Sequence, residues 1–162
     1  ADIEVSEKGG EGVIATQGGR FGGWGLFMRQ GKVVYHYNLA GVQRDEVVTP
    51  EKLAPGRHTI LLDFAYDGGD IGQGGLAKLS VDGAVAAQGR IRQTLFSRIA
   101  LDETLDIGLD TGTPITEDYQ VPFAFNGGLK TVTIELKPMD EATAAAAVNP
   151  LKSAMLRKIL QD

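Results

Sequence analysis

The stretch Gly18–Asn38, GGRFGGWGLFMRQGKVVYHYN, decides the fold that this sequence predicts. Two alternating runs flank Gln30–Gly31, and glycine readily adopts the positive φ that a tight hairpin turn needs. A two-residue loop places three cross-strand pairs on one face: Met28 with Val33, Leu26 with Tyr35, and Trp24 with Tyr37. This apolar and aromatic face has to pack on a second sheet, because an isolated hairpin is at best marginally stable in water.

The opposite face of this hairpin is mixed in character. It carries Phe27 beside Arg29, Lys32 and His36, a combination that suits either partial exposure or a second contact. Neither His36 nor His58, the two histidines of the chain, has a partner at metal-ligand spacing, so we interpret both as structural.

Length and composition indicate one β-rich domain with a helical end. A chain of 162 residues with 43% hydrophobic content can bury a substantial core. Its 22 glycines lie singly or in pairs between apolar runs, as in the turns and bulges of a many-stranded β protein. We predict an all-β sandwich of two antiparallel sheets over residues 1–137. A helical tail is expected over residues 138–162, which are rich in alanine and carry an apolar stripe at helical spacing.

Alternation along the later strands predicts further apolar faces. One long strand places five residues on a core face: His58, Ile60, Leu62, Phe64 and Tyr66. A strand at 105–109 is expected to turn three residues inward: Leu105, Ile107 and Leu109. The last strand, Leu129–Leu136, is expected to align Val132, Ile134 and Leu136.

A second hairpin, Leu76–Ile91, turns around Asp82–Gly83. A three-residue loop gathers four apolar side chains on one face: Leu79, Val81, Val85 and Ala87. A two-residue loop instead pairs Val81 with Ala84 and buries Gln88, so we favour the three-residue loop.

Charge and cysteine content exclude several classes of partner and chemistry. With 16 Lys and Arg residues against 21 Asp and Glu residues, the formal net charge is −5, so we expect no nucleic-acid partner. The absence of cysteine excludes disulfides, thiolate metal sites and a cysteine nucleophile. No apolar run approaches the roughly 18 residues of a membrane span, so we expect a soluble chain without a membrane partner. Any targeting signal is expected to be removed or to lie outside this sequence.

The acidic residues after Ala100 are the first candidates for chemistry. Asp102, Asp106 and Asp110 are evenly spaced, and a β-sandwich glycosidase would use paired carboxyls from one strand. The Glu-x-Asp-x-Glu pattern of such enzymes is missing, so we interpret these acids as loop or turn residues. No EF-hand-like Asp-rich loop, Gly-x-Ser-x-Gly elbow or phosphate loop occurs either, so we expect no metal in this chain.

Four specific blocks follow one another along most of the chain. They read GGRFGGW at Gly18–Trp24, FAYDGGDIGQGG at Phe64–Gly75, LSVDG at Leu79–Gly83 and DIGLDTGTPITEDY at Asp106–Tyr119. In these blocks the chain resembles the C-terminal domain of large bacterial arylsulfatases, over residues 2–136. The resemblance implies a concanavalin-like jelly-roll sandwich that follows a sulfatase catalytic domain, in a bacterial cytoplasm or periplasm.

The catalytic residues of that family do not carry over. Sulfatases use a Cys or Ser of a C/S-x-P-x-R motif, oxidised to formylglycine beside a calcium ion, and no serine here begins such a motif. We therefore expect no catalytic residue and no cofactor in this chain, and calcium only in a parent sulfatase catalytic domain. The tail after Pro138 is not part of the family pattern.

Two glycine-rich loops, 64–75 and 106–119, are the predicted docking surface, because glycine and short polar residues let backbone groups meet a partner closely. The candidate contact residues are Arg20, Trp24, Asp67, Asp70, Asp110, Thr111, Thr113, Asp118 and Tyr119. We expect them to pack on or border a sulfatase catalytic domain, in cis or in trans.

The alternative function is a free-standing, carbohydrate-binding lectin-like domain. Trp24, Tyr35 and Tyr37 would then stack on a glycan, as aromatic platforms do in sugar-binding sandwiches. Their shared face is also the most apolar one of the sequence, which favours core packing over a sugar platform.

Overall fold

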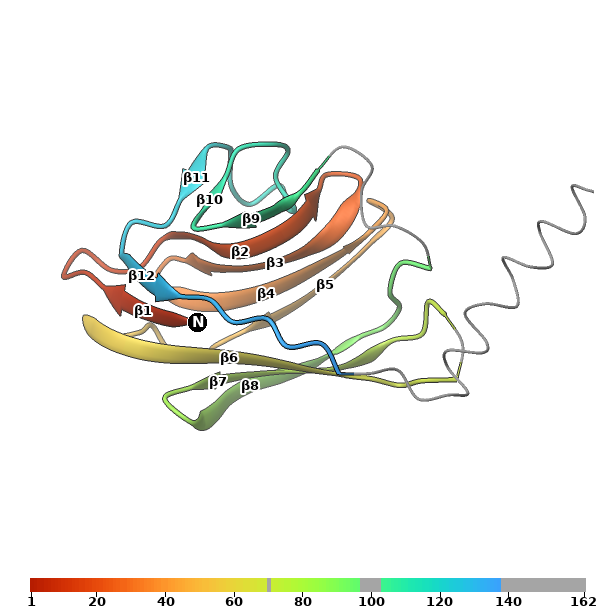
Figure 1. Cartoon of the computed structure of the whole chain (residues 1–162), viewed down its shortest axis with the longest axis horizontal. Helices are drawn as coiled ribbons and strands as arrows, with labels where there is room; N and C mark the ends of the chain where they lie inside the picture. The colour runs from red at the N-terminus through yellow and green to blue at the C-terminus, as the bar shows by residue number, and fades with distance from the viewer. Residues whose placement is uncertain (70, 97–102, 138–162) are drawn as a thin grey trace, which may run out of the picture.

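The computed structural model describes residues 1–69, 71–96 and 103–137 (Figure 1). These residues form twelve strands: β1 (Asp2–Val5), β2 (Gly12–Gly19), β3 (Gly22–Arg29), β4 (Lys32–Leu39), β5 (Gln43–Val48), β6 (Gly56–Tyr66), β7 (Gly75–Val81), β8 (Ala84–Ile91), β9 (Leu105–Ile107), β10 (Leu109–Asp110), β11 (Phe123–Ala124) and β12 (Gly128–Thr131). The described part of the chain contains no helix, and hence none with the length and apolar character of a membrane span. The predicted helical tail, 138–162, lies outside the described residues.

The strands form two facing sheets, so the predicted all-β, two-sheet architecture is confirmed (Figure 1). The five-stranded sheet has the order β12-β1-β6-β7-β8. The seven-stranded sheet has the order β10-β11-β2-β3-β4-β5, and β9 also pairs with β2. Within the described residues every strand pair is antiparallel except β11 with β2.

The central hairpin has the predicted register. Gln30 and Gly31 form its two-residue loop with φ values of 54° and 80°, the positive values that such a turn demands. Trp24 lies opposite Tyr37, Leu26 opposite Tyr35 and Met28 opposite Val33. All of these side chains except Trp24 are buried, and Trp24 is half-buried against the same core.

The main core lies between the two sheets. The central hairpin supplies Leu26, Met28, Val33, Tyr35 and Tyr37, which pack with residues of the opposite sheet such as Ile3, Val5, Ile60, Ala77, Leu79 and Ile91. Each fully buried aliphatic side chain contributes roughly 1.5–3 kcal/mol to stability. The predicted core face of β6 is confirmed at Ile60, with Leu62 and Phe64 partly buried against the same cluster.

A second core covers the outer face of the seven-stranded sheet. Phe27 and Val34, both fully buried, pack there against Ile115 and Tyr119 from the segment that follows β10. The ring of Tyr119 meets Phe27 edge to face at 5.4 Å and stacks on Phe123 at 4.4 Å. Of the two alternatives for the mixed face of the hairpin, a second contact is therefore the correct one.

The loop predicted for the second hairpin is wrong. Val81 pairs directly with Ala84, and Asp82–Gly83 forms a two-residue loop with φ values of 52° and 84°. A bulge near Leu79 then absorbs one residue of β8. The bulge keeps Ala87 on the core side and turns Val85 outward, where it is 61% exposed.

Two of the apolar faces predicted near the end of the chain are also wrong. Leu105, Ile107 and Leu109 are 40–45% exposed, because the covered side of these short strands is the one that carries Asp106 and Asp110. Strand β12 ends at Thr131, so only Val132 packs on the core, whereas Ile134 and Leu136 are 46% and 89% exposed. Alternation indicates two faces, but it does not tell which face the rest of the chain covers.

Candidate functional site

One end of the sandwich gathers four of the predicted contact residues, Arg20, Asp67, Thr111 and Thr113. We call it the loop end. It consists of the turns 19–22 and 39–43, the loop residues 67–69 and 71–74, and the segments 92–96 and 111–114 (Figure 1). These pieces come from both sheets and are far apart in sequence.

Asn38 holds two of the turns together. Its side chain is fully buried at the end of β4. Its Nδ2 donates to the carbonyl oxygens of Gly19 and Arg20, both at 3.0 Å, and its Oδ1 accepts from the N–H of Gly41 at 2.8 Å. One amide thereby satisfies backbone groups of both turns and holds them together at the end of the sheet.

Thr113 ties the 111–114 segment to the same turn. Its Oγ1 accepts from the N–H of Arg20 at 2.9 Å, and its own N–H and Oγ1 donate to Glu103 Oε1 at 2.9 and 2.8 Å. A Cβ on Gly112 would collide with Glu103 Oε2, so a side chain at that position would push the carboxylate away from Thr113. Thr111 is exposed beside this contact.

The loop end exposes three large apolar side chains. Phe21 is 73% exposed, Val42 84% and Phe96 73%. Their segments touch: a Cβ on Gly22 would lie 3.1 Å from Leu95 Cδ1, and one on Gly72 would lie 3.4 Å from Phe96 Cβ. The apolar tips therefore belong to one surface, which we call the apolar rim. Arg20 is exposed next to Phe21 and makes no ion pair with any described residue.

Asp67 and Trp24 have structural partners within the chain. The guanidinium of Arg90 donates to both carboxylate oxygens of Asp67, and this bidentate hydrogen bond lowers the pKa of Asp67. Trp24 packs its half-buried side chain on the main core. Asp70 lies outside the described residues.

Asp110, Tyr119 and Asp118 lie in the second core and at its border. The Tyr119 hydroxyl donates to Asp110 Oδ2 at 2.6 Å and accepts from the N–H of Ile115 at 3.1 Å. Burial raises the pKa of Asp110, although the hydrogen bond from Tyr119 opposes the shift. Asp118 accepts from Arg29 across the sheet face. These three side chains hold the 109–119 segment on the sheet.

The same geometry bears on the glycosidase alternative. Asp110 is 1% exposed and engaged by Tyr119, so its carboxyl does not reach a glycosidic oxygen in this arrangement. Asp106 accepts from the neighbouring Thr104 hydroxyl at 3.2 Å. Asp102 lies outside the described residues.

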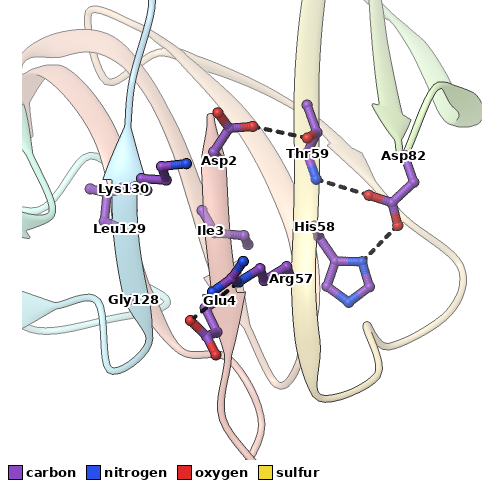
Figure 2. A pocket seen from close by; sticks show the side chains of 10 residues that line it. All are labelled: Asp2, Ile3, Glu4, Arg57, His58, Thr59, Asp82, Gly128, Leu129 and Lys130. Atoms are coloured by element: carbon purple, nitrogen blue, oxygen red, sulfur yellow. Dashed lines mark hydrogen bonds and ion pairs between the residues drawn. The ribbon is translucent and has the colours of Figure 1, made fainter.

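A cavity of about 530 Å³ opens on the five-stranded sheet, away from the loop end (Figure 2). Strands β12, β1 and β6 and the β7–β8 turn supply its lining: Asp2, Ile3, Glu4, Arg57, His58, Thr59, Asp82, Gly128, Leu129 and Lys130. Three acidic side chains and three basic ones face this space, so it offers hydrogen-bonding groups of both signs. Figure 2 shows a chain of contacts from Asp2 through Thr59 and Asp82 to His58.

Both ring nitrogens of His58 face hydrogen-bond acceptors, an arrangement that favours the protonated ring. Its Nδ1 lies 2.8 Å from Asp82 Oδ2 and its Nε2 lies 2.9 Å from the carbonyl oxygen of Ala54, and both partners only accept hydrogen bonds. Burial opposes the charge, but these bonds and the Asp82 carboxylate outweigh it, so the pKa of His58 is raised. The side chain clamps the β7–β8 turn to the start of β6, in keeping with its structural interpretation.

Sequence reasoning missed the residues that give the loop end its character. Phe21 stands between an arginine and two glycines, and an aromatic residue flanked by turn formers is a signal for an exposed tip. Val42 follows Gly41 and Phe96 follows Leu95, and neither setting distinguishes an exposed apolar tip from a buried side chain. Asn38 ends an alternating strand, where its role in joining two turns depends on contacts that only the fold creates.

Comparisons with other proteins give no identity. Within the described residues no group of three or more His, Asp or Glu side chains is placed to hold a metal ion. No family model, no curated protein and no solved structure matches this chain.

Proposed function

We propose that this chain is a non-catalytic accessory domain that docks through its loop end onto the catalytic domain of an arylsulfatase-like sulfuric ester hydrolase. The domain packs on that partner, in cis or in trans, or borders the mouth of its active site. The chain supplies no nucleophile in this proposal, because sulfate ester cleavage needs an activated nucleophile and a Lewis acid.

The apolar rim is the observation that carries the docking proposal. Phe21, Val42 and Phe96 project from three separate segments and stay largely exposed, with the exposed Arg20 beside them. Aromatic residues and arginine are the residue types that protein interfaces enrich and that dominate their binding energy. The hydrogen bonds of Asn38 and Thr113 hold the supporting turns in place, so a partner meets a preformed surface.

The sulfatase part of the proposal rests on the sequence resemblance. The GGRFGGW block forms the turn that carries Phe21, and the DTGTPITEDY block forms the segment that Tyr119 holds on the sheet. In the same proposal the two-sheet sandwich is a concanavalin-like jelly roll. Asp110, Asp118 and Tyr119 then act by shaping the loop end, while Arg20, Thr111 and the apolar rim make the contact.

A glycan-binding domain is the second candidate, and the polar cavity on the five-stranded sheet favours it. Its donors and acceptors of both signs match the hydroxyl groups of a sugar. The cavity has no Trp, Tyr or Phe in its lining on which a sugar ring would stack, and Trp24 packs on the main core instead. The docking function therefore has the stronger support.

The test compares two variants of the 162-residue chain. The first carries Phe21→Ser, Val42→Ser and Phe96→Ser in the apolar rim. The matched control carries Val85→Ser and Leu136→Ser, which are 61% and 89% exposed elsewhere. Surface changes of this kind alter folding stability by less than about 0.5 kcal/mol. Binding to the purified sulfatase catalytic domain encoded with this chain is measured by calorimetry, and a glycan array is probed in parallel.

We expect the rim variant to lose about a hundredfold in affinity, since two or more hot-spot residues at about 1.4 kcal/mol each are removed. The control variant should bind like the natural chain. Equal affinity of both variants, or saturable glycan binding without any binding to the catalytic domain, would overturn the docking proposal.

A further inference from the structure

Beyond the point where β1 begins, no described strand pairs with the outer edge of β6. Strand β6 pairs with β7 over Ile60–Tyr66 but with β1 only over Gly56–Thr59, and one further exchange joins Ile60 to Ala1. In that exchange the N–H of Ile60 donates to the carbonyl oxygen of Ala1 at 2.8 Å, and the carbonyl oxygen of Ile60 accepts from the amino group of Ala1 at 2.7 Å. Among the described residues, the half of β6 that continues past Ala1 therefore has a neighbouring strand on one side alone.

Alternation fixes which backbone groups face this open side. Thr59 exchanges hydrogen bonds with Asp82 on the β7 side, so Leu61 and Asp63 point their N–H and C=O groups toward β7 as well. Leu62 and Phe64 follow Ile60 and point to the β1 side. No described residue hydrogen-bonds the backbone of Leu62 or Phe64 on that side.

The side chains along this edge are less covered than their counterparts next to β1. Ile60 is 1% exposed, whereas Leu62 and Phe64, on the same core face, are only partly buried. Residues 132–137 run on along β6, where Lys137 reaches Asp63 at 3.1 Å, but these six residues form no strand (Figure 1). Its Ile134 and Leu136 remain 46% and 89% exposed. Along this stretch, backbone groups that no described residue pairs with thus coincide with apolar side chains that are only partly buried.

We infer that this edge of β6 binds an extended peptide segment of a partner protein as an added strand, in line with β1 and antiparallel to β6. An unpaired row of N–H and C=O groups is complementary to another extended backbone, and to no other common element. This inference goes beyond the proposed function and does not depend on it, because it rests on the backbone groups of Leu62 and Phe64 and not on the apolar rim.

The register of β6 defines the sequence that such a segment needs. Residues opposite Leu62 and Phe64 face the core, so they have to be apolar. The residue between them lies opposite Asp63 on the solvent face, where a lysine or arginine is favoured and shares the carboxylate with Lys137. The partner segment is therefore an apolar, cationic, apolar triplet in extended conformation, with β-branched residues preferred.

Amide hydrogen exchange of the full 162-residue chain tests this inference by NMR. The probe is an acetylated and amidated hexapeptide in which valine alternates with lysine and threonine. In the free protein the amides of Leu61 and Asp63 should exchange slowly and those of Leu62 and Phe64 fast. Saturating peptide should slow exchange at Leu62 and Phe64 by about tenfold or more, the factor that corresponds to one net hydrogen bond of about 1.4 kcal/mol.

Two controls separate strand addition from general stickiness. The same peptide with N-methyl groups on the valines that lie opposite Leu62 and Phe64 loses the donors that face β6, and it should bind at least about tenfold more weakly. The Asp63→Lys variant of the protein should also weaken binding of the lysine peptide, and a glutamate version of the peptide should reverse this preference.

Three results would overturn the inference. The first is slow exchange of Leu62 and Phe64 in the free protein, which would show that another part of the chain already pairs with the edge. The second is equal binding of the parent and N-methylated peptides. The third is protection that rises with protein concentration without peptide, which would assign the edge to a second copy of this chain.

Discussion

Replacing Tyr119 with phenylalanine tests the second core at its polar centre. The Tyr119→Phe change keeps the ring that meets Phe27 and Phe123, and it removes only the hydroxyl. That hydroxyl donates to the 1% exposed Asp110 at 2.6 Å and accepts from the N–H of Ile115 at 3.1 Å. Losing a hydrogen bond to a buried carboxylate costs about 1.5–3 kcal/mol, and the orphaned N–H adds to it, so we expect a loss of about 2–4 kcal/mol.

The cost of Tyr119→Phe should depend on pH. Burial raises the pKa of Asp110 and the Tyr119 hydroxyl counteracts this, so removing the hydroxyl raises the pKa further. A raised carboxyl pKa means that the folded state holds its proton longer than the unfolded state, so stability falls as pH rises through that window. The variant should therefore lose less stability at pH 4 than at pH 7, because a protonated Asp110 needs the hydroxyl less.

Urea unfolding followed by the fluorescence of Trp24, the single tryptophan, measures both effects. For a chain of this size the expected loss lowers the melting temperature by about 6–12 °C. Asp110→Asn is the matched control: it keeps the shape and the acceptor for Tyr119 but removes the buried charge, and should cost less than about 1 kcal/mol. A Tyr119→Phe variant within about 0.5 kcal/mol of the natural chain at pH 7 would refute the polar centre as described.

Three further predictions follow from the same structure. Because the pKa of His58 is raised in the folded state, the stabilising contribution of His58 is full below about pH 6.5 and is lost as pH rises through the folded pKa. Urea unfolding at pH 6 and pH 9 should show this loss of stability in the natural chain. An equal loss in the His58→Gln variant would contradict the assignment to His58. Phe27→Ala should cost about 3–5 kcal/mol of folding stability in thermal unfolding, because Phe27 is fully buried. Trp24→Ala should cost less, because Trp24 is only half-buried, and a larger loss for Trp24→Ala would contradict this order of burial. Val85→Thr should shift the urea midpoint by less than the equivalent of about 0.5 kcal/mol while Leu79→Ala costs about 2–5 kcal/mol, and a large effect at Val85 would restore the three-residue loop.

The central hairpin was predictable because its signals are local. Glycine at the turn and strict alternation on both sides leave one register in which every apolar residue of one face meets an apolar partner. The second hairpin has the same kind of turn, but its register also depends on a bulge near Leu79. A bulge is set by the balance of packing on both sheet faces, so alternation around Asp82–Gly83 does not reveal it.

The second core shows why the candidate site was only partly predictable. Asp110 and Tyr119 carry polar groups and sit in a glycine-rich segment, which is the composition of an exposed loop. They are buried because Phe27 and Val34 present an apolar patch far away in sequence. Phe21 and Phe96 show the converse: phenylalanine is a residue type typical of protein cores, yet both side chains lie on the surface. Burial in both cases is decided by tertiary neighbours.

The position of β1 between β6 and β12 has a consequence for how the chain reaches its native state. Ile3 lies opposite His58 on one side and Leu129 on the other, so the earliest strand in the sequence has its second partner in the last one. Pairing of β1 with β12 closes a loop that contains most of the described residues, and this closure costs conformational entropy before the strand contact stabilises the fold. Folding is therefore expected on the millisecond to second scale of sandwiches with distant pairings. Strand β1 therefore stays an edge strand of the β6 sheet until residues 128–131 have been synthesised and pair with it.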